Sequence, residues 1–174
     1  LLYEYAQQSL YPDTTYGYDS GGDPVHIIDL SYEAFVDFHK RLYHPANSLV
    51  YFYGDDDPGE RLERLEAYLA EFEADEGLAA IPLQPRFTKP LQVERSYAGN
   101  EDLFVTTNWL LGSSTDLQMN LSFNLLAYML TGSPASPLRV ALIQSGLGED
   151  LTGAGLEGQI QEMYYSTGLK GVEG

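Results

Sequence analysis

The chain has 174 residues, of which 44% are hydrophobic and 13% aromatic, so it is long enough to fold around a substantial apolar core. Its formal net charge of -17 argues against nucleic acid or an anionic membrane surface as a partner, because both attract Lys and Arg. The absence of cysteine excludes disulfides and thiolate chemistry, and since no apolar run approaches the roughly 20 residues that span a bilayer, we expect a soluble protein.

The first part of the chain predicts two helices separated by a loop. Apolar residues at helical spacing predict a helix over 1–10, which Pro12 ends. A loop rich in Gly, Asp and Pro follows over 11–26. Ser31 then stands where it can cap a second amphipathic helix over 31–43, and "HPANS" stops that helix.

A β-rich run, "SLVYFYG" (48–54), comes next and is the only clear strand of the first half. Asp57 and Pro58 then open a strongly amphipathic helix over 58–73. A lone strand cannot satisfy its own backbone donors and acceptors. We therefore expect 48–54 either to join the sheet of the second half or to pair with sequence upstream of this chain.

An Ala-, Gly- and Pro-rich stretch over 74–90 predicts a linker and a boundary between two parts of the chain. Beyond it the pattern indicates strands and helices without the strict βα alternation of a parallel sheet. The expected strands are 91–98 and 101–111 around a turn at Gly99-Asn100, then 151–159 and 162–172, with helices over 116–130 and 138–146.

The three histidines raise the possibility of zinc, because imidazole is the usual metal ligand where cysteine is absent. His39 and His44 are five residues apart and a proline follows the second, so they do not share a helical face as the pair of a zincin helix does. A structural role is favoured for all three, His26 included. One of them would lie at a helix C-terminus, where its charge meets the negative end of the dipole.

Two other groups of residues resemble functional sites only superficially. Asp55, Asp56 and Asp57 could suggest Ca²⁺ or Mg²⁺, but the spacing is not that of a calcium loop, and Asp57 as a helix N-cap explains the same residues. Ser133 and Ser136 have no identifiable base and fit a turn and an N-cap. No glycine-rich stretch fits a phosphate-binding loop. Local chemistry thus identifies no catalytic, metal-binding or substrate-binding residue.

Five spaced blocks of the sequence nevertheless resemble one family when taken in order. They are "YPDTTYGYDSGGDP", "FHKRLYHPANSLVYFYGDDDPGERL", "NWLL", "TGSPASPLRVALIQSGLGED" and "STGLKGV". Together they resemble the presequence protease branch of the pitrilysin/insulinase-type (inverzincin) zinc metallopeptidases. The resemblance covers nearly the whole chain.

The resemblance implies an α+β fold, a mainly antiparallel sheet with helices packed on one face, and parts of two pitrilysin-type α+β units. Residues 1–80 would be the C-terminal part of the first, catalytic-type unit. Residues 81–174 would be the linker and the N-terminal part of a second, non-catalytic unit. The chain would therefore be an internal fragment of a longer protein, and its partners would be the remaining domains of that protein and peptide substrates.

The family's zinc motif, H-x-x-E-H, is absent from the sequence. The third zinc ligand of the family, a glutamate, would lie a little upstream of Leu1. The resemblance therefore implies a zinc cofactor in the full-length parent and none bound by this fragment. The loop over 11–26 would be a shaped turn, built by Gly21, Gly22 and Asp23-Pro24, that could help to position the zinc helix.

Two functions stay open for the parent protein. The first is a zinc metalloendopeptidase that degrades short unstructured peptides in a closed chamber, and the negative charge would suit basic targeting peptides, although it could also serve solubility alone. The alternative is a non-catalytic homologue with a structural or peptide-holding role. The compartment would be the cytoplasm in a bacterium or an organelle matrix in a eukaryote.

Overall fold

The computed structural model describes residues 1–75, 77, 80–99 and 103–173. Contacts divide it into two compact units, one made of residues 1–21 and 81–174 and the other of residues 22–80. We call them the sheet unit and the helical unit and describe each separately.

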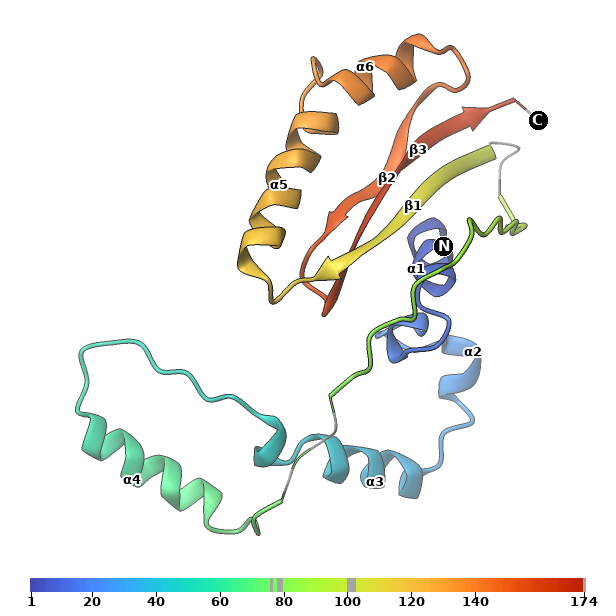
Figure 1. Ribbon diagram of the computed structural model, residues 1–174. Coiled ribbons are helices and arrows are strands. Elements are labelled where there is room, and N and C mark those ends of the chain that lie inside the picture. Colours follow the sequence, from blue (N-terminus) through green and yellow to red (C-terminus); the bar gives the residue numbers. More distant parts are fainter. Residues whose placement is uncertain (76, 78–79, 100–102, 174) are drawn as a thin grey trace. The chain divides into compact units, whose positions relative to one another are not determined.

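The sheet unit is built on three antiparallel strands in the order β1-β3-β2 (Figure 1). The strands are β1 (Leu103–Ser113), β2 (Asp150–Glu157) and β3 (Glu162–Val172). The helices of this unit are α1 (Leu2–Leu10), α5 (Leu117–Thr131) and α6 (Pro137–Gln144), with a short 3-10 turn at Thr15–Gly17. The predicted α+β fold with an antiparallel sheet is confirmed.

The central strand β3 is covered on both faces. Five consecutive residues, from Met163 to Thr167, are buried. Because side chains alternate between the faces of a strand, such a run requires a covering layer on each side. Tyr164 packs against the ring of Tyr11, just after α1, while the hydroxyl of Tyr165 lies 3.1 Å from that of Thr131 in α5.

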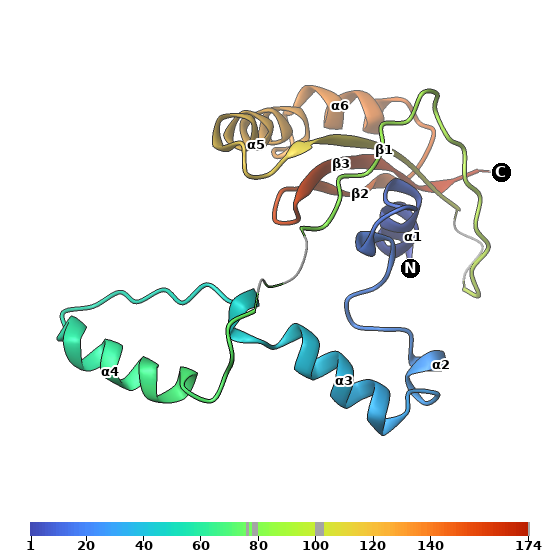
Figure 2. The same ribbon diagram turned by 60° about the horizontal axis from the view of Figure 1, so that its bottom comes forward.

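Helices accordingly lie on both sides of the sheet (Figure 2). Helices α5 and α6 lie on one side and α1 on the other. We expected helices on one face of the sheet only. The structure has these helices and, in addition, α1 on the other face. Residues 1–21 thus fold with the sheet although some 80 residues separate them from it in sequence.

One predicted strand of this unit is wrong. Residues 91–98 form no strand, although Leu91, Val93 and Tyr97 gave them a β-like pattern. A strand exists only where a neighbour completes its hydrogen-bond ladder, and composition does not supply that neighbour. The predicted turn at Gly99-Asn100 lies partly outside the described residues, since only Gly99 is described.

The helical unit contains α2 (Pro24–Ile27), α3 (Tyr32–Leu42), a 3-10 turn at Pro45–Asn47 and α4 (Pro58–Leu69). Its N-caps are those expected from the sequence. The Ser31 hydroxyl accepts from the Ala34 amide at 3.1 Å, and one Asp57 carboxylate oxygen accepts from the amides of Gly59 and Glu60 at 2.7 and 3.1 Å. Local hydrogen bonding therefore fixes where α3 and α4 begin.

Residues 48–54, predicted as a strand, do not join the sheet of the second half, and pairing with sequence upstream of this chain stays a prediction. The segment is extended but pairs in no sheet among the described residues, and it does not join β1, β3 or β2. Exposure alternates along it, with Val50 and Phe52 about half exposed and Leu49, Tyr51 and Tyr53 far more so. The residues keep the period of a strand, but a strand forms only with a partner.

Tyr11 connects the chain after α1 to the central strand. Its side chain is fully buried, and its hydroxyl donates to the backbone oxygen of Glu162 at 2.5 Å. The ring packs between Tyr16 and Tyr164, with centroids 5.7 and 6.1 Å away. Burial, assisted by the nearby Glu162 carboxylate, raises the pKa of the Tyr11 hydroxyl well above its usual value of 10.

We expect Tyr11→Phe to lower the free energy of unfolding by about 0.5–1.5 kcal/mol, because the ring packing stays and one buried hydrogen bond is lost. Urea unfolding at pH 8 measures this. Tyr18→Phe is the control, since Tyr18 is exposed and its hydroxyl should contribute little. Equal losses for the two variants would contradict the assignment.

The same variant predicts a pH dependence. Because the pKa of Tyr11 is raised on folding, its contribution is complete below about pH 10, the pKa of the unfolded residue, and declines as the pH rises above it. The stability gap between wild type and Tyr11→Phe should therefore narrow between pH 9 and pH 11. A gap that stays constant over this range would show that the hydroxyl is not held protonated by the fold.

Candidate functional site

Among the described residues, no group of three or more His, Asp or Glu side chains is placed to hold a metal ion. The ring of His39 stacks on Tyr43 at 4.5 Å, and His44 Nδ1 accepts from the Ala46 amide at 3.2 Å. His26 lies on α2, 3.9 Å from each of two exposed aspartates, Asp23 and Asp29. His39 and His44 thus contact other residues of the helical unit, and His44 also lies edge-on to the Phe72 ring at 5.4 Å.

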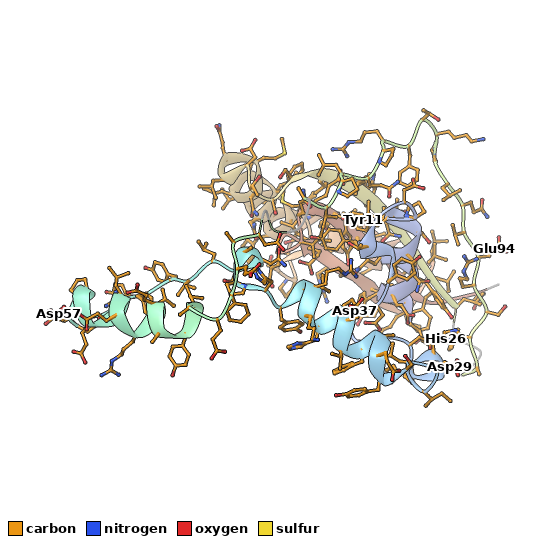
Figure 3. The ribbon with its side chains drawn as sticks, turned by 90° about the horizontal axis from the view of Figure 1, so that it is seen from below. Tyr11, His26, Asp29, Asp37, Asp57 and Glu94 are labelled. Atoms are coloured by element: carbon orange, nitrogen blue, oxygen red, sulfur yellow. The ribbon has the colours of Figure 1, made fainter. Side chains whose placement is uncertain are left out.

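The acidic run before α4 is also engaged locally. Asp57 caps α4, and the Asp56 carboxylate receives a 2.7 Å hydrogen bond from Arg61 Nε. The guanidinium of Arg61 in turn lies 4.6 Å from the centre of the Phe52 ring. Asp57 and His26 lie at opposite ends of the helical unit (Figure 3), so these two groups do not combine into one site.

The serines before α6 form a turn. The Ser136 hydroxyl accepts from the Ser133 amide at 3.0 Å and donates to the Tyr128 carbonyl at 3.3 Å. Ser136 is buried and stands at the N-cap position of α6, but its side chain bonds to these two neighbours and not to the helix. Among the described residues, the hydrogen bonds of the Ser133 and Ser136 hydroxyls go to each other and to backbone groups, not to a base.

The Gly- and Asp-rich loop over 11–26 has the geometry of a turn. Gly22 has a φ of 77°, in the left-handed region, and the Asp19 carboxylate accepts from the Gly21 amide at 2.8 Å. Asp23 caps the short α2 by accepting from the Val25 amide at 2.9 Å. The predicted turn is confirmed, with Gly22 as the residue that requires glycine.

A buried polar network that the sequence analysis did not find lies at one end of the sheet. The Glu162 carboxylate is almost inaccessible to solvent and accepts from the Gln84 amide at 2.8 Å. The Arg86 guanidinium lies 3.7 Å from the same carboxylate and donates to the carbonyls of Leu110 and Leu111, at 3.0 and 2.5 Å. These donors compensate the free-energy cost of burying the Glu162 carboxylate away from water.

Gln84 extends this network to the segment after α1. Its side-chain amide donates to the Asp13 carboxylate at 2.8 Å, and its side-chain oxygen accepts from the Asp13 backbone amide at 3.1 Å. These hydrogen bonds connect residues far apart in the sequence. Asp13 and Gln84 are 71 positions apart, and Tyr11 and Glu162 are 151 positions apart. No local pattern could have revealed these pairs. The arrangement fastens the linker over the end of the sheet and is structural.

Comparison with known proteins gives the family. A model described as "Peptidase M16 inactive domain" matches residues 29–167, which is most of the chain. The chain belongs to the M16 peptidase family. The resemblance to pitrilysin/insulinase-type peptidases, predicted from five sequence blocks, is confirmed.

Several M16 relatives are presequence proteases. The chain is 42% identical over 181 residues to "Presequence protease 1, chloroplastic/mitochondrial" of Arabidopsis thaliana and 35% identical over 182 residues to "Presequence protease, mitochondrial" of Mus musculus, in each case over 99% of this chain. It is also 42% identical over 160 residues, 88% of the chain, to "Protein HypA" of Clostridium perfringens. The chain spans 16–18% of the length of these M16 relatives.

The M16 match crosses both units of the structure, because residues 29–80 lie in the helical unit and residues 81–167 in the sheet unit. No helix within the described ranges is long and apolar enough to cross a membrane.

We expect Gly22→Val to lower the free energy of unfolding by about 1–3 kcal/mol, because a β-branched residue is strained at a φ of 77°. Space is not the obstacle, since an added Cβ would lie 3.5 Å from its nearest neighbour, Ile27. Asp19→Asn is the matched control and should cost much less, because an amide oxygen can accept the same hydrogen bond. A ligand loop would reverse this order, with a Ca²⁺- or Zn²⁺-dependent gain in melting temperature that Asp19→Asn removes.

We expect Glu162→Gln to destabilise the protein by about 1–3 kcal/mol, since it removes a charged acceptor and buries an amide donor that has no acceptor facing it. Glu71→Gln, at an exposed position, is the control and should change stability by less than about 0.5 kcal/mol. Chemical denaturation of both variants measures the difference. An unchanged midpoint for Glu162→Gln would mean that the network does not hold the linker.

Proposed function

We propose that this chain is one part of a zinc metalloendopeptidase that degrades short unstructured peptides of the presequence type, and that this part does not itself bind the zinc. The observation that carries the proposal is the identity of 42% to a presequence protease over 99% of the chain. The matching family model is described as an inactive domain, which supports the proposal that this part does not itself bind zinc.

The residues of this chain do not fit a catalytic zinc site. The sequence holds no H-x-x-E-H. His26 lies near Asp23 and Asp29, His39 stacks on Tyr43, and His44 contacts the Ala46 amide and the Phe72 ring. A zinc site of the catalytic type needs three protein ligands that converge on one point, and no such set occurs in the described part of the chain. We therefore assign zinc to the full-length parent and derive no catalytic step from the residues described here.

The proposed role of this part is to build the chamber wall. We propose that residues 1–80 complete a first, catalytic-type α+β unit and that residues 81–174 begin a second, non-catalytic one. Residues 1–21 would then belong to the catalytic-type α+β unit but pack on the sheet of the non-catalytic one. The hydrogen bonds of Tyr11 with Glu162 and of Asp13 with Gln84 would join the two α+β units. Remaining domains of the same polypeptide would close the chamber.

The net charge of -17 supports basic peptides as substrates, since a chamber lined by acidic surface attracts them. Two of the relatives carry chloroplastic or mitochondrial in their names, and a eukaryotic source would place this protein in an organelle matrix. A bacterial source would place it in the cytoplasm.

The full-length gene product tests the proposal. It should contain H-x-x-E-H upstream of this chain and cleave unstructured basic peptides in a chelator-sensitive way. Lack of the motif, together with peptide binding without cleavage, would instead select a non-catalytic, peptide-holding homologue of the same fold.

We expect the 174-residue chain alone to bind Zn²⁺ no more tightly than about micromolar, because the sequence lacks H-x-x-E-H and the described residues hold no group of three metal ligands. It should also leave a quenched fluorescent peptide intact. Titration calorimetry with Zn²⁺ and the peptide assay measure these two properties. Chelator-sensitive cleavage by the pure chain would overturn the assignment of zinc to other parts of the protein.

A further inference from the structure

Helix α5 is apolar on both of its sides. Its sheet-facing side carries Phe123, Ala127 and Leu130, which are partly buried. Helices that are apolar all round are buried in globular proteins, whereas a surface helix keeps a polar outer face. Gln118, Ser122 and Asn124 are exposed polar residues of α5, but most of its exposed residues are large and apolar.

The outward side of α5 is nevertheless open in the sheet unit. Five large apolar residues on it are each more than half exposed: Leu117, Leu121, Leu125, Tyr128 and Met129. The first four follow each other at spacings of four, four and three residues, which places them on one stripe of the helix. We call these five residues the α5 stripe. Figures 1 and 2 show α5 lying over the sheet.

The charge around the stripe restricts what can cover it. The chain as a whole has a net charge of -17, but no charged residue occurs from Leu117 to Leu138. A partner that binds through ion pairs would therefore find no charged residue in this segment to pair with. The face suits the apolar side of another helix, packed lengthwise as ridges into grooves.

We propose that the α5 stripe is an interface for an apolar helix from another domain of the same polypeptide. The proposal rests on the proposed function, in which the chain is part of a longer protein. Its support is that the matched relatives are about six times as long as this chain, which spans 16–18% of them. A second copy of this chain is the competing occupant, and the strong negative charge elsewhere on both copies disfavours it.

The chain carries natural probes of this interface. Met129 belongs to the stripe and is 65% exposed, whereas Met163 on β3 is fully buried. Peroxide converts accessible methionine to the sulfoxide, which mass spectrometry quantifies residue by residue. In the isolated 174-residue chain Met129 should therefore oxidise far faster than Met163.

In the full-length gene product Met129 should oxidise at least tenfold more slowly than in the isolated chain, while Met163 stays slow in both. Equal rates of Met129 oxidation in the two would overturn the proposal. So would protection of Met129 in the isolated chain that grows with concentration and accompanies a dimer in analytical ultracentrifugation, because the occupant would then be a second copy.

A matched pair of variants makes the test independent of how well the isolated chain folds. In the full-length protein Leu121→Glu should restore fast oxidation of Met129, since a carboxylate cannot stay in an apolar interface. Leu62→Glu on α4 is the control, because Leu62 and Leu121 are both 62% exposed, and it should leave Met129 protected. Protection of Met129 that survives Leu121→Glu would contradict the proposal. A gene product no longer than this chain, or one without peptidase activity, would instead contradict the proposed function.

Discussion

The fold of the sheet unit depends on burying strand β3 from both sides. Its residues come from the end of the chain, while one covering layer comes from the first 21 residues and the other from α5 and α6. Tyr11 joins the first layer to the strand by one buried hydrogen bond and by packing against Tyr16 and Tyr164. Without this residue the α1 side of β3 would expose Tyr164, so the N-terminal segment completes the core.

The polar network at Glu162 follows from the same constraint. Where the chain crosses the end of the sheet, Gln84 and Glu162 are buried, so their polar groups need partners within the protein. The Gln84 backbone amide donates to the Glu162 carboxylate, and the Gln84 side chain hydrogen-bonds to Asp13. The Arg86 guanidinium donates to the carbonyls of Leu110 and Leu111, near the end of β1. Residues 84–86 are therefore part of the sheet unit and not a free tether.

The sequence predicted what is decided locally. Caps at Ser31 and Asp57 and the turn at Gly22 depend on neighbours within a few residues, and all are found in the structure. Three of the predicted strands are also found, although β1 pairs with a strand far away in the sequence. Residues 91–98 form no strand and residues 48–54 do not join the sheet, because a strand needs a partner, which propensity does not specify. The Glu162 network was missed for the same reason, since its members lie far apart in the chain.

Family membership was recognised from the order of five blocks, not from any site, and the structure explains why. The side chains that first suggested chemistry are used for caps, stacking and turns: His44 and Asp57 begin helices, His39 stacks on Tyr43, and Ser136 closes a turn. In the proposed enzyme, what this part would contribute is shape: a covered sheet, a fastened linker and an apolar helix face. Ordered blocks of residues can therefore identify the family although no group of three metal-ligating side chains occurs among the described residues.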